Sequence, residues 1–237
     1  MSKLYPASTI RFADIDGLTV IMDLNTEDYY VFNETATLFW SLIIENDGDL
    51  MVGAQALKGN RQTATNILEK RLHTFFADCL EHGFLTQNRP VVDQFESKGC
   101  FRSKSNRFLT LQAWWNLVLT AYYYRVNGFA RTYNNYAQLR FDNSNENLDQ
   151  ILKSALASFL KAENLFWYNQ APRDCLPRSL ALFRFLRSLG IQVIHYIGGR
   201  RFPGFTMHAW VEYNGNVVLD DSQQSMEYTV ISSLPRL

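Results

Sequence analysis

The chain has 237 residues, a length that accommodates one large domain or two small ones. Hydrophobic residues make up 47% of it and aromatic residues 14%, which excludes an intrinsically disordered chain and favours a well-buried core. The formal net charge is zero, so the composition does not indicate a nucleic-acid-binding protein.

The three cysteines, Cys79, Cys100 and Cys175, do not have the spacing of a disulfide framework. An odd, widely spaced set is typical of free thiols in a reducing compartment. The N-terminus lacks the basic and then apolar pattern of a signal peptide, and no run of about 18 apolar residues predicts a transmembrane helix. We therefore expect a cytoplasmic protein with no membrane partner.

Short β-rich runs separated by turn residues predict a three-stranded meander near the N-terminus, over residues 9–12, 18–24 and 28–32. Asn33 is a candidate N-cap of the helix that follows. A longer helix is expected over residues 62–82, because apolar residues recur there at helical spacing and Gly83 follows.

The run from Asp28 to Ala36, followed by Phe39-Trp40 and by the closing segment 80–85, resembles PqqD-like domains. The resemblance covers residues ~5–88 and implies a winged-helix-like domain. Such domains bind a leader peptide as an added strand on the third strand, against the last helix. Without the resemblance, residues 29–32 would be interpreted as an ordinary half-buried strand. The leader-binding residues that it implies are Tyr29, Tyr30, Val31, Phe32, Arg71 and Phe75.

A polar, irregular stretch between residues 86 and 106 is the best candidate for a linker. We therefore expect a first domain over residues 1–90, a linker over 91–106 and a second domain over 107–237. A helix is predicted from residue 107 to about Gly128. Its apolar stripe is expected to face the core, since such a stripe is more often a core face than a binding surface. That stripe comprises Phe108, Leu111, Trp115, Leu119 and Tyr122 or Tyr123.

The segment from Asp174 to Gly190 predicts a helix that begins at a cysteine. Asp174 is a candidate N-cap, and Pro177 falls in the first turn, where a missing N–H costs little. Gly190 ends the helix in a C-cap role. Cys175 is therefore expected at the positive end of the helix dipole, where a thiolate is stabilised.

Two β-rich segments follow this helix: residues 192–197, which contain His195, and a hairpin that carries His208 and Asp220. A cysteine on a helix start, a histidine on a strand and an aspartate on the next strand suit a thiol nucleophile, its base and the group that orients the base. Either histidine is a candidate base, but His195 alternates with apolar residues and is expected to be structural. A zinc site formed by Cys175 and both histidines is a weaker alternative, because the short ligand pairs typical of zinc sites are missing.

The hairpin leaves a choice between two adjacent aspartates. A two-residue loop, Asn214-Gly215, would place Asp221 opposite His208. A three-residue loop that begins at Tyr213 would place Asp220 there, and it keeps the carboxylate away from the apolar face. We therefore predict the three-residue loop and Asp220.

The Cys–His–Asp order resembles the transglutaminase-like branch of papain-type cysteine peptidases. Four motifs resemble the lasso peptide B proteins: residues 174–182 (DCLPRSLAL), 197–200 (IGGR), 208–212 (HAWVE) and 217–220 (VVLD). The resemblance implies an α+β fold and a leader peptidase with Cys175 as nucleophile, His208 as base and Asp220 as its orienter. It also implies two partners, the precursor peptide and a lasso cyclase of the asparagine-synthetase type, and no cofactor.

An oxyanion donor is also needed for acyl transfer. The backbone N–H of Cys175 is one candidate, and the side chain of Asn169 or Gln170 is another. Two alternatives of different classes remain open. One is an acyl transferase that forms amides, as a true transglutaminase does. The other is a leader-binding adaptor that has no activity.

Overall fold

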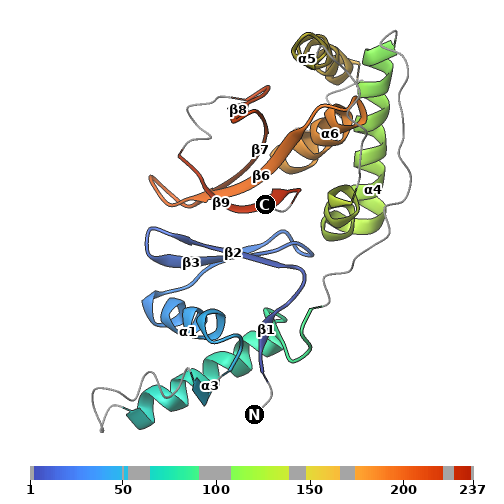
Figure 1. Ribbon diagram of the computed structural model, residues 1–237. Helices are drawn as coiled ribbons and strands as arrows, with labels where there is room; N and C mark the ends of the chain where they lie inside the picture. Colours follow the sequence, from blue (N-terminus) through green and yellow to red (C-terminus); the bar gives the residue numbers. More distant parts are fainter. Residues whose placement is uncertain are drawn as a thin grey trace. The chain divides into compact units, whose positions relative to one another are not determined.

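The computed structural model describes residues 3–49, 51–52, 65–90, 108–138, 148–165, 174–220 and 227–235. The chain divides into two compact units, residues 1–94 and residues 95–237, and each is described by itself (Figure 1). Helices combined with antiparallel sheets confirm the predicted α+β class. The predicted linker, residues 91–106, lies outside the described residues, so its boundaries stay predictions.

A three-stranded antiparallel meander forms the main sheet of the first unit, as predicted. Its strands, in spatial order, are β2 (Ile10–Ile15), β3 (Leu18–Asp23) and β4 (Tyr29–Val31). Asp16 and Gly17 join β2 to β3, and both have a positive φ, as a two-residue type I′ turn requires. Two strands that the sequence analysis missed, β1 (Tyr5–Pro6) and β5 (Leu85–Thr86), pair with each other.

Two helices, α1 (Glu34–Glu45) and α3 (Thr65–Glu81), complete the first unit. Asn33 caps α1, since its side chain accepts a hydrogen bond from the Ala36 N–H. Apolar side chains from both helices and from the sheet form one core. Its members include Ile10, Ile21, Phe39, Trp40, Ile43, Leu72, Phe76 and Leu85.

The second unit has a four-stranded antiparallel sheet with the order β8-β7-β6-β9. Helix α6 (Cys175–Ser188) packs against β6 and β7 and also against α4, and its apolar side chains are almost all buried. This central helix carries Cys175, so the nucleophile candidate begins the most enclosed helix of the unit. The other elements are α4 (Leu109–Ala137), α5 (Leu148–Asn164), β6 (Val193–Arg200), β7 (Thr206–Tyr213), β8 (Asn216–Val217) and β9 (Thr229–Leu234).

Helix α4 differs from the prediction in length. It continues to Ala137 across a kink at Gly128, where φ is 73° and ψ is 171°. Glycine adopts such a left-handed φ without steric cost, so the residue expected to end the helix bends it instead. Among the described residues, no helix combines the length and the apolar character needed to span a membrane.

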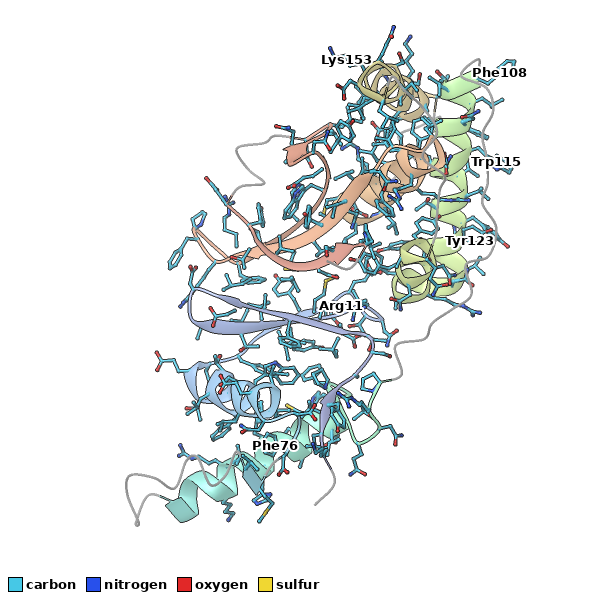
Figure 2. The ribbon with its side chains drawn as sticks, in the orientation of Figure 1. Arg11, Phe76, Phe108, Trp115, Tyr123 and Lys153 are labelled. Atoms are coloured by element: carbon cyan, nitrogen blue, oxygen red, sulfur yellow. The ribbon has the colours of Figure 1, made fainter. Side chains whose placement is uncertain are left out.

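The apolar stripe expected to face the core lies on the exposed side of α4, so that prediction is wrong. Phe108, Leu111 and Trp115 are 64%, 61% and 53% exposed. Figure 2 shows Phe108 and Trp115 projecting away from the rest of the second unit. Before the kink, the buried side of the helix instead carries Leu109, Ala113, Leu117 and Thr120.

Candidate active site

Cys175 is the first residue of α6, as expected. Asp174 is in the N-cap position with an extended backbone, but its side chain makes no capping hydrogen bond, which differs from the expected cap. The N–H groups of the first turn and the helix dipole provide partial positive charge next to the thiol.

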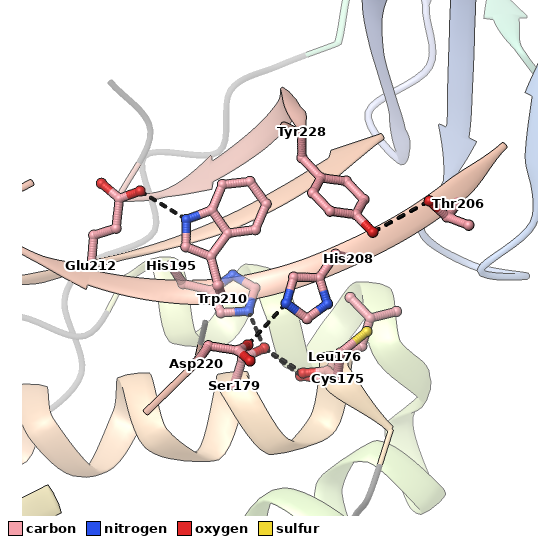
Figure 3. A network of polar contacts seen from close by, with 10 residues as sticks. All are labelled: Cys175, Leu176, Ser179, His195, Thr206, His208, Trp210, Glu212, Asp220 and Tyr228. Atoms are coloured by element: carbon pink, nitrogen blue, oxygen red, sulfur yellow. Dashed lines mark hydrogen bonds and ion pairs between the residues drawn. The ribbon is translucent and has the colours of Figure 1, made fainter. Parts of the chain in front are cut away.

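His208, on β7, links the thiol to a carboxylate. Its Nε2 lies 2.9 Å from Oδ2 of Asp220 (Figure 3). The hydrogen bond with Cys175 raises the pKa of His208, burial opposes this rise, and the negative charge of Asp220 raises the pKa further. Because Nε2 faces the carboxylate, Nδ1 is the ring nitrogen left for the thiol. The three side chains expected to act together are therefore adjacent.

The hairpin brings Asp220 to His208 by a different route from the predicted one. Tyr213 pairs with Asn216, so the loop has two residues, and the prediction of a three-residue loop is wrong. Asn214 and Gly215 both have a positive φ, as in a type I′ turn. The regular ladder would place Asp221 opposite His208, but it ends at Val217.

Leu219 redirects the chain after that point. The last hydrogen bond along the hairpin runs from the Val218 N–H to the Val211 carbonyl. Leu219 then adopts a left-handed φ of 60°, which is costly for a residue with a Cβ. This bend brings the Asp220 carboxylate to His208 in place of its neighbour, while Asp221 lies outside the described residues.

Two aromatic rings hold the imidazole from the side. The Trp210 ring stacks on His208 with centroids 6.1 Å apart and planes 12° apart, and the Tyr228 ring lies 5.5 Å from His208. Trp210 is buried, and its Nε1–H donates to Glu212 at 2.8 Å. His208 and Trp210 are two residues apart on one strand, so the sequence alone predicts that their side chains share a face of the sheet. Tyr228 was missed, because nothing predicted β9 or the segment just before it.

A small cavity of about 150 Å³ adjoins the three candidate residues. Arg178 lines it and is held by Glu163, with 2.5 Å between Nε and Oε1. That hydrogen bond raises the pKa of Arg178, and the charge of Asp220 adds to the rise. The other residues around the cavity are Cys175, Ser179, Leu182, His208, Ala209, Trp210, Val211, Val218 and Asp220.

The other candidates from the sequence are placed elsewhere or not described. His195 is fully buried and burial lowers its pKa to about 3, as suits the structural histidine that was expected. Asn169 and Gln170, the candidate oxyanion donors, lie outside the described residues. Within the described ranges, no group of three or more His, Cys, Asp or Glu side chains is placed to hold a metal ion.

The residues predicted to bind a leader peptide lie in the first unit. Tyr29, Tyr30 and Val31 are exposed along β4, the last strand of its sheet. The Phe32 ring contacts that of Phe75 on α3, with centroids 5.4 Å apart. Arg71, one helical turn before Phe75, is exposed. Strand β4 and α3 therefore lie next to each other, as the prediction requires.

Comparison with known proteins bears on the second unit above all. Residues 117–233 match the family model of the transglutaminase-like superfamily, a span that includes Cys175, His208 and Asp220. This part of the chain is therefore similar to the transglutaminase-like superfamily. The match confirms the transglutaminase-like fold that the sequence motifs implied, and it supports an enzyme of the cysteine-peptidase type.

Two solved structures match part of this chain at low identity. One is TbiB1 in complex with the TbiA(beta) leader peptide, at 19% identity and a TM-score of 0.32. The other is lasso peptide synthetase B1 complexed with the leader peptide, at 19% identity and a TM-score of 0.33. Each match covers 36% of this chain, and 98% and 99% of the respective solved chain. Curated proteins gave no match.

Proposed function

We propose that this protein is a cysteine peptidase that removes the leader peptide from a lasso peptide precursor. One observation carries the proposal: a single imidazole, His208, joins the thiol at the start of α6 to the carboxylate of Asp220. The family of residues 117–233 and the four sequence motifs of the lasso peptide B proteins support the same function.

The proposed reaction begins with attack of the Cys175 thiolate on the scissile carbonyl. His208 accepts the thiol proton and returns it to the leaving amine, while Asp220 holds the imidazole and stabilises its positive charge. The C–N bond breaks and a thioester forms between the enzyme and the leader. His208 then takes a proton from water, the resulting hydroxide cleaves the thioester, and the thiol is restored. The N–H of Cys175 is the proposed oxyanion donor, and no cofactor is required.

Leader recognition is assigned to the first unit. An extended peptide would add a strand at β4 and contact Phe32 as well as Arg71 and Phe75 of α3. The exposed residues of β4, its position at the edge of the sheet and the contact between Phe32 and Phe75 support this assignment. The lasso cyclase of the asparagine-synthetase type, which would close the ring after cleavage, is the proposed second partner.

Incubation with candidate precursor peptides, followed by mass measurement, tests the proposal. We expect two products from the wild-type protein, with masses that sum to the precursor plus one water, and none from Cys175→Ala. Products that carry an added amine in place of water would indicate the acyl transferase instead. Binding of the precursor without cleavage would indicate the adaptor and would refute the peptidase.

A further inference from the structure

A buried histidine and a serine lie directly behind the first turn of α6. The side chain of His195, on β6, is 0% exposed, and its Nε2 is 2.9 Å from Oγ of Ser179. Ser179 follows Cys175 by one helical turn, and its Oγ is 2.6 Å from the Cys175 carbonyl oxygen (Figure 3). A chain of two hydrogen bonds therefore connects the sheet to the backbone of the candidate nucleophile.

The direction of this chain follows from a count of hydrogens. The Ser179 hydroxyl has one hydrogen, and a carbonyl oxygen only accepts, so the hydroxyl donates to Cys175. His195 must then donate from Nε2–H to Oγ, which makes Nδ1 the nitrogen without a hydrogen. Nδ1 is buried and has no hydrogen-bond partner among the described residues.

A second nucleophile and base pair is excluded by the same count. The hydroxyl hydrogen of Ser179 is already donated, and its oxygen faces the interior. His195 acts on Ser179 as a donor, and burial keeps the imidazole neutral because its pKa falls to about 3. A neutral donor with a fixed tautomer can hold a neighbouring group in place, but it cannot accept the serine proton.

The imidazole is costly in this position, which points to a specific role. A buried nitrogen without a partner destabilises the fold, whereas an apolar side chain of similar size would avoid that cost. His195 packs between the rings of Tyr133 and Phe183, so its surroundings would accept such a side chain. What an apolar side chain could not provide is the hydrogen bond to Ser179.

We propose that His195 and Ser179 are positioning residues that hold the Cys175 turn of α6 in register with His208. Strand β6 pairs His195 with Val211 of β7, and His208 lies three residues before Val211 on that strand. The two hydrogen bonds therefore join the turn with the thiol to the strand pair that carries the base. This inference rests on the proposed roles of Cys175 and His208.

Alkylation of Cys175 by iodoacetamide tests the inference without any peptide substrate. The rate is measured from pH 5 to 9 in the full-length protein with Cys100→Ser, and mass mapping assigns the modified residue. Cys79 is buried and its pKa is raised to about 12, so it contributes little. The variants are Ser179→Ala, His195→Leu and His195→Gln, whose amide N–H occupies roughly the position of Nε2–H.

We expect Ser179→Ala and His195→Leu each to slow alkylation at neutral pH by about 10-fold, because the thiol loses its alignment with His208. The double variant should be no slower than either single variant, since both remove the same connection. His195→Gln should recover a rate within about 3-fold of the wild type, since an amide N–H can replace the donor.

Two outcomes would overturn the inference. The melting temperature of each variant is measured alongside, so that slow alkylation is not mistaken for loss of the fold. The first is a wild-type alkylation rate in folded His195→Leu, which would reduce the histidine to a stability role. The second is a His195→Gln rate as slow as that of His195→Leu at equal melting temperature. If the alkylation pattern holds but no precursor is cleaved, the proposed peptidase fails while the positioning role stands.

Discussion

Asp220 Oδ2 lies 2.9 Å from His208 Nε2, although the pairing of β7 with β8 ends at Val217, before it reaches either residue. The bend at Leu219 makes this contact. The carboxylate that contacts the proposed base is therefore set by one left-handed residue and not by the strand register.

The first prediction follows from that contact. Asp220→Ala should lower kcat/KM for precursor cleavage by about 100-fold or more, because the imidazole loses its orienting partner and the stabilisation of its charge. Asp221→Ala, the matched control, should keep most of the activity. A cleavage assay in which the two variants rank in the opposite order would assign the role to Asp221.

The second prediction concerns the alkaline limit of activity. The hydrogen bond with Cys175 and the charge of Asp220 both raise the pKa of His208, and a thiolate–imidazolium pair lasts only while His208 is protonated. Cleavage needs the protonated imidazole to supply a proton to the leaving amine, so removing the Asp220 charge should move the alkaline limb of kcat/KM for precursor cleavage to lower pH. Asp220→Asn keeps the shape of the side chain, so a limb that stays in place in this variant would contradict the assigned cause.

Much of the second unit could be predicted from its sequence because the local signals there agree. The cap position, Pro177 and the apolar spacing all indicate a helix that starts at Cys175, and the Asn214-Gly215 pair marks the hairpin. The predicted loop length is wrong because the prediction extends the apolar alternation of the strand past Val217, where the strand ends. A leucine has no preference for a left-handed conformation, so nothing in the sequence marks the bend at Leu219.

Helix α4 shows a second limit of sequence patterns. Apolar and aromatic residues occur on both sides of this helix, so the period is clear but the buried face is not. Ala113 and Thr120 face the interior, and Thr120 is satisfied there by a 2.9 Å hydrogen bond with Tyr136. A hydropathy pattern scores Thr120 as exposed because it cannot see the buried partner of the hydroxyl. The same pattern assigns the larger apolar side chain of Trp115 to the core.

The third prediction tests the aromatic support of His208. A Cβ on Gly198 would lie 2.8 Å from the Trp210 ring and 2.9 Å from the Thr229 carbonyl oxygen, both closer than real contacts allow. Gly198→Ala should therefore displace Trp210 from the face of His208 and lower kcat by about 10-fold. Gly204→Ala, where a Cβ meets open space, should leave kcat unchanged. Near-UV circular dichroism reports whether the tryptophan has moved.

The fourth prediction is a dependence of stability on pH that comes from His195. Burial lowers its pKa from 6.5 to about 3, so between these values the unfolded chain binds the additional proton. This contribution to stability is complete above pH 6.5 and is lost as the pH falls toward 3. Urea unfolding should show a loss of about 2 kcal/mol between pH 6.5 and 5 that is absent in His195→Gln, at about 1.4 kcal/mol per pH unit. His73→Gln, at an exposed histidine, should behave like the wild type.

The last prediction concerns the edge of β4. The Phe32 N–H donates to the Thr19 carbonyl on β3 at 2.9 Å. Backbone groups alternate in direction along a strand, so the Tyr30 N–H also faces β3 and the Val31 N–H faces away from it. Val31→Pro should therefore remove a donor from the proposed peptide edge and leave the pairing with β3 intact.

We expect Val31→Pro to weaken leader binding by about 10-fold in calorimetry, which corresponds to the loss of one main-chain hydrogen bond. Its melting temperature should stay close to that of the wild type. Tyr30→Pro is the contrasting variant, because it removes a donor from the sheet itself and should lower the melting temperature as well. Unchanged leader affinity in a folded Val31→Pro protein would place the leader elsewhere on the chain.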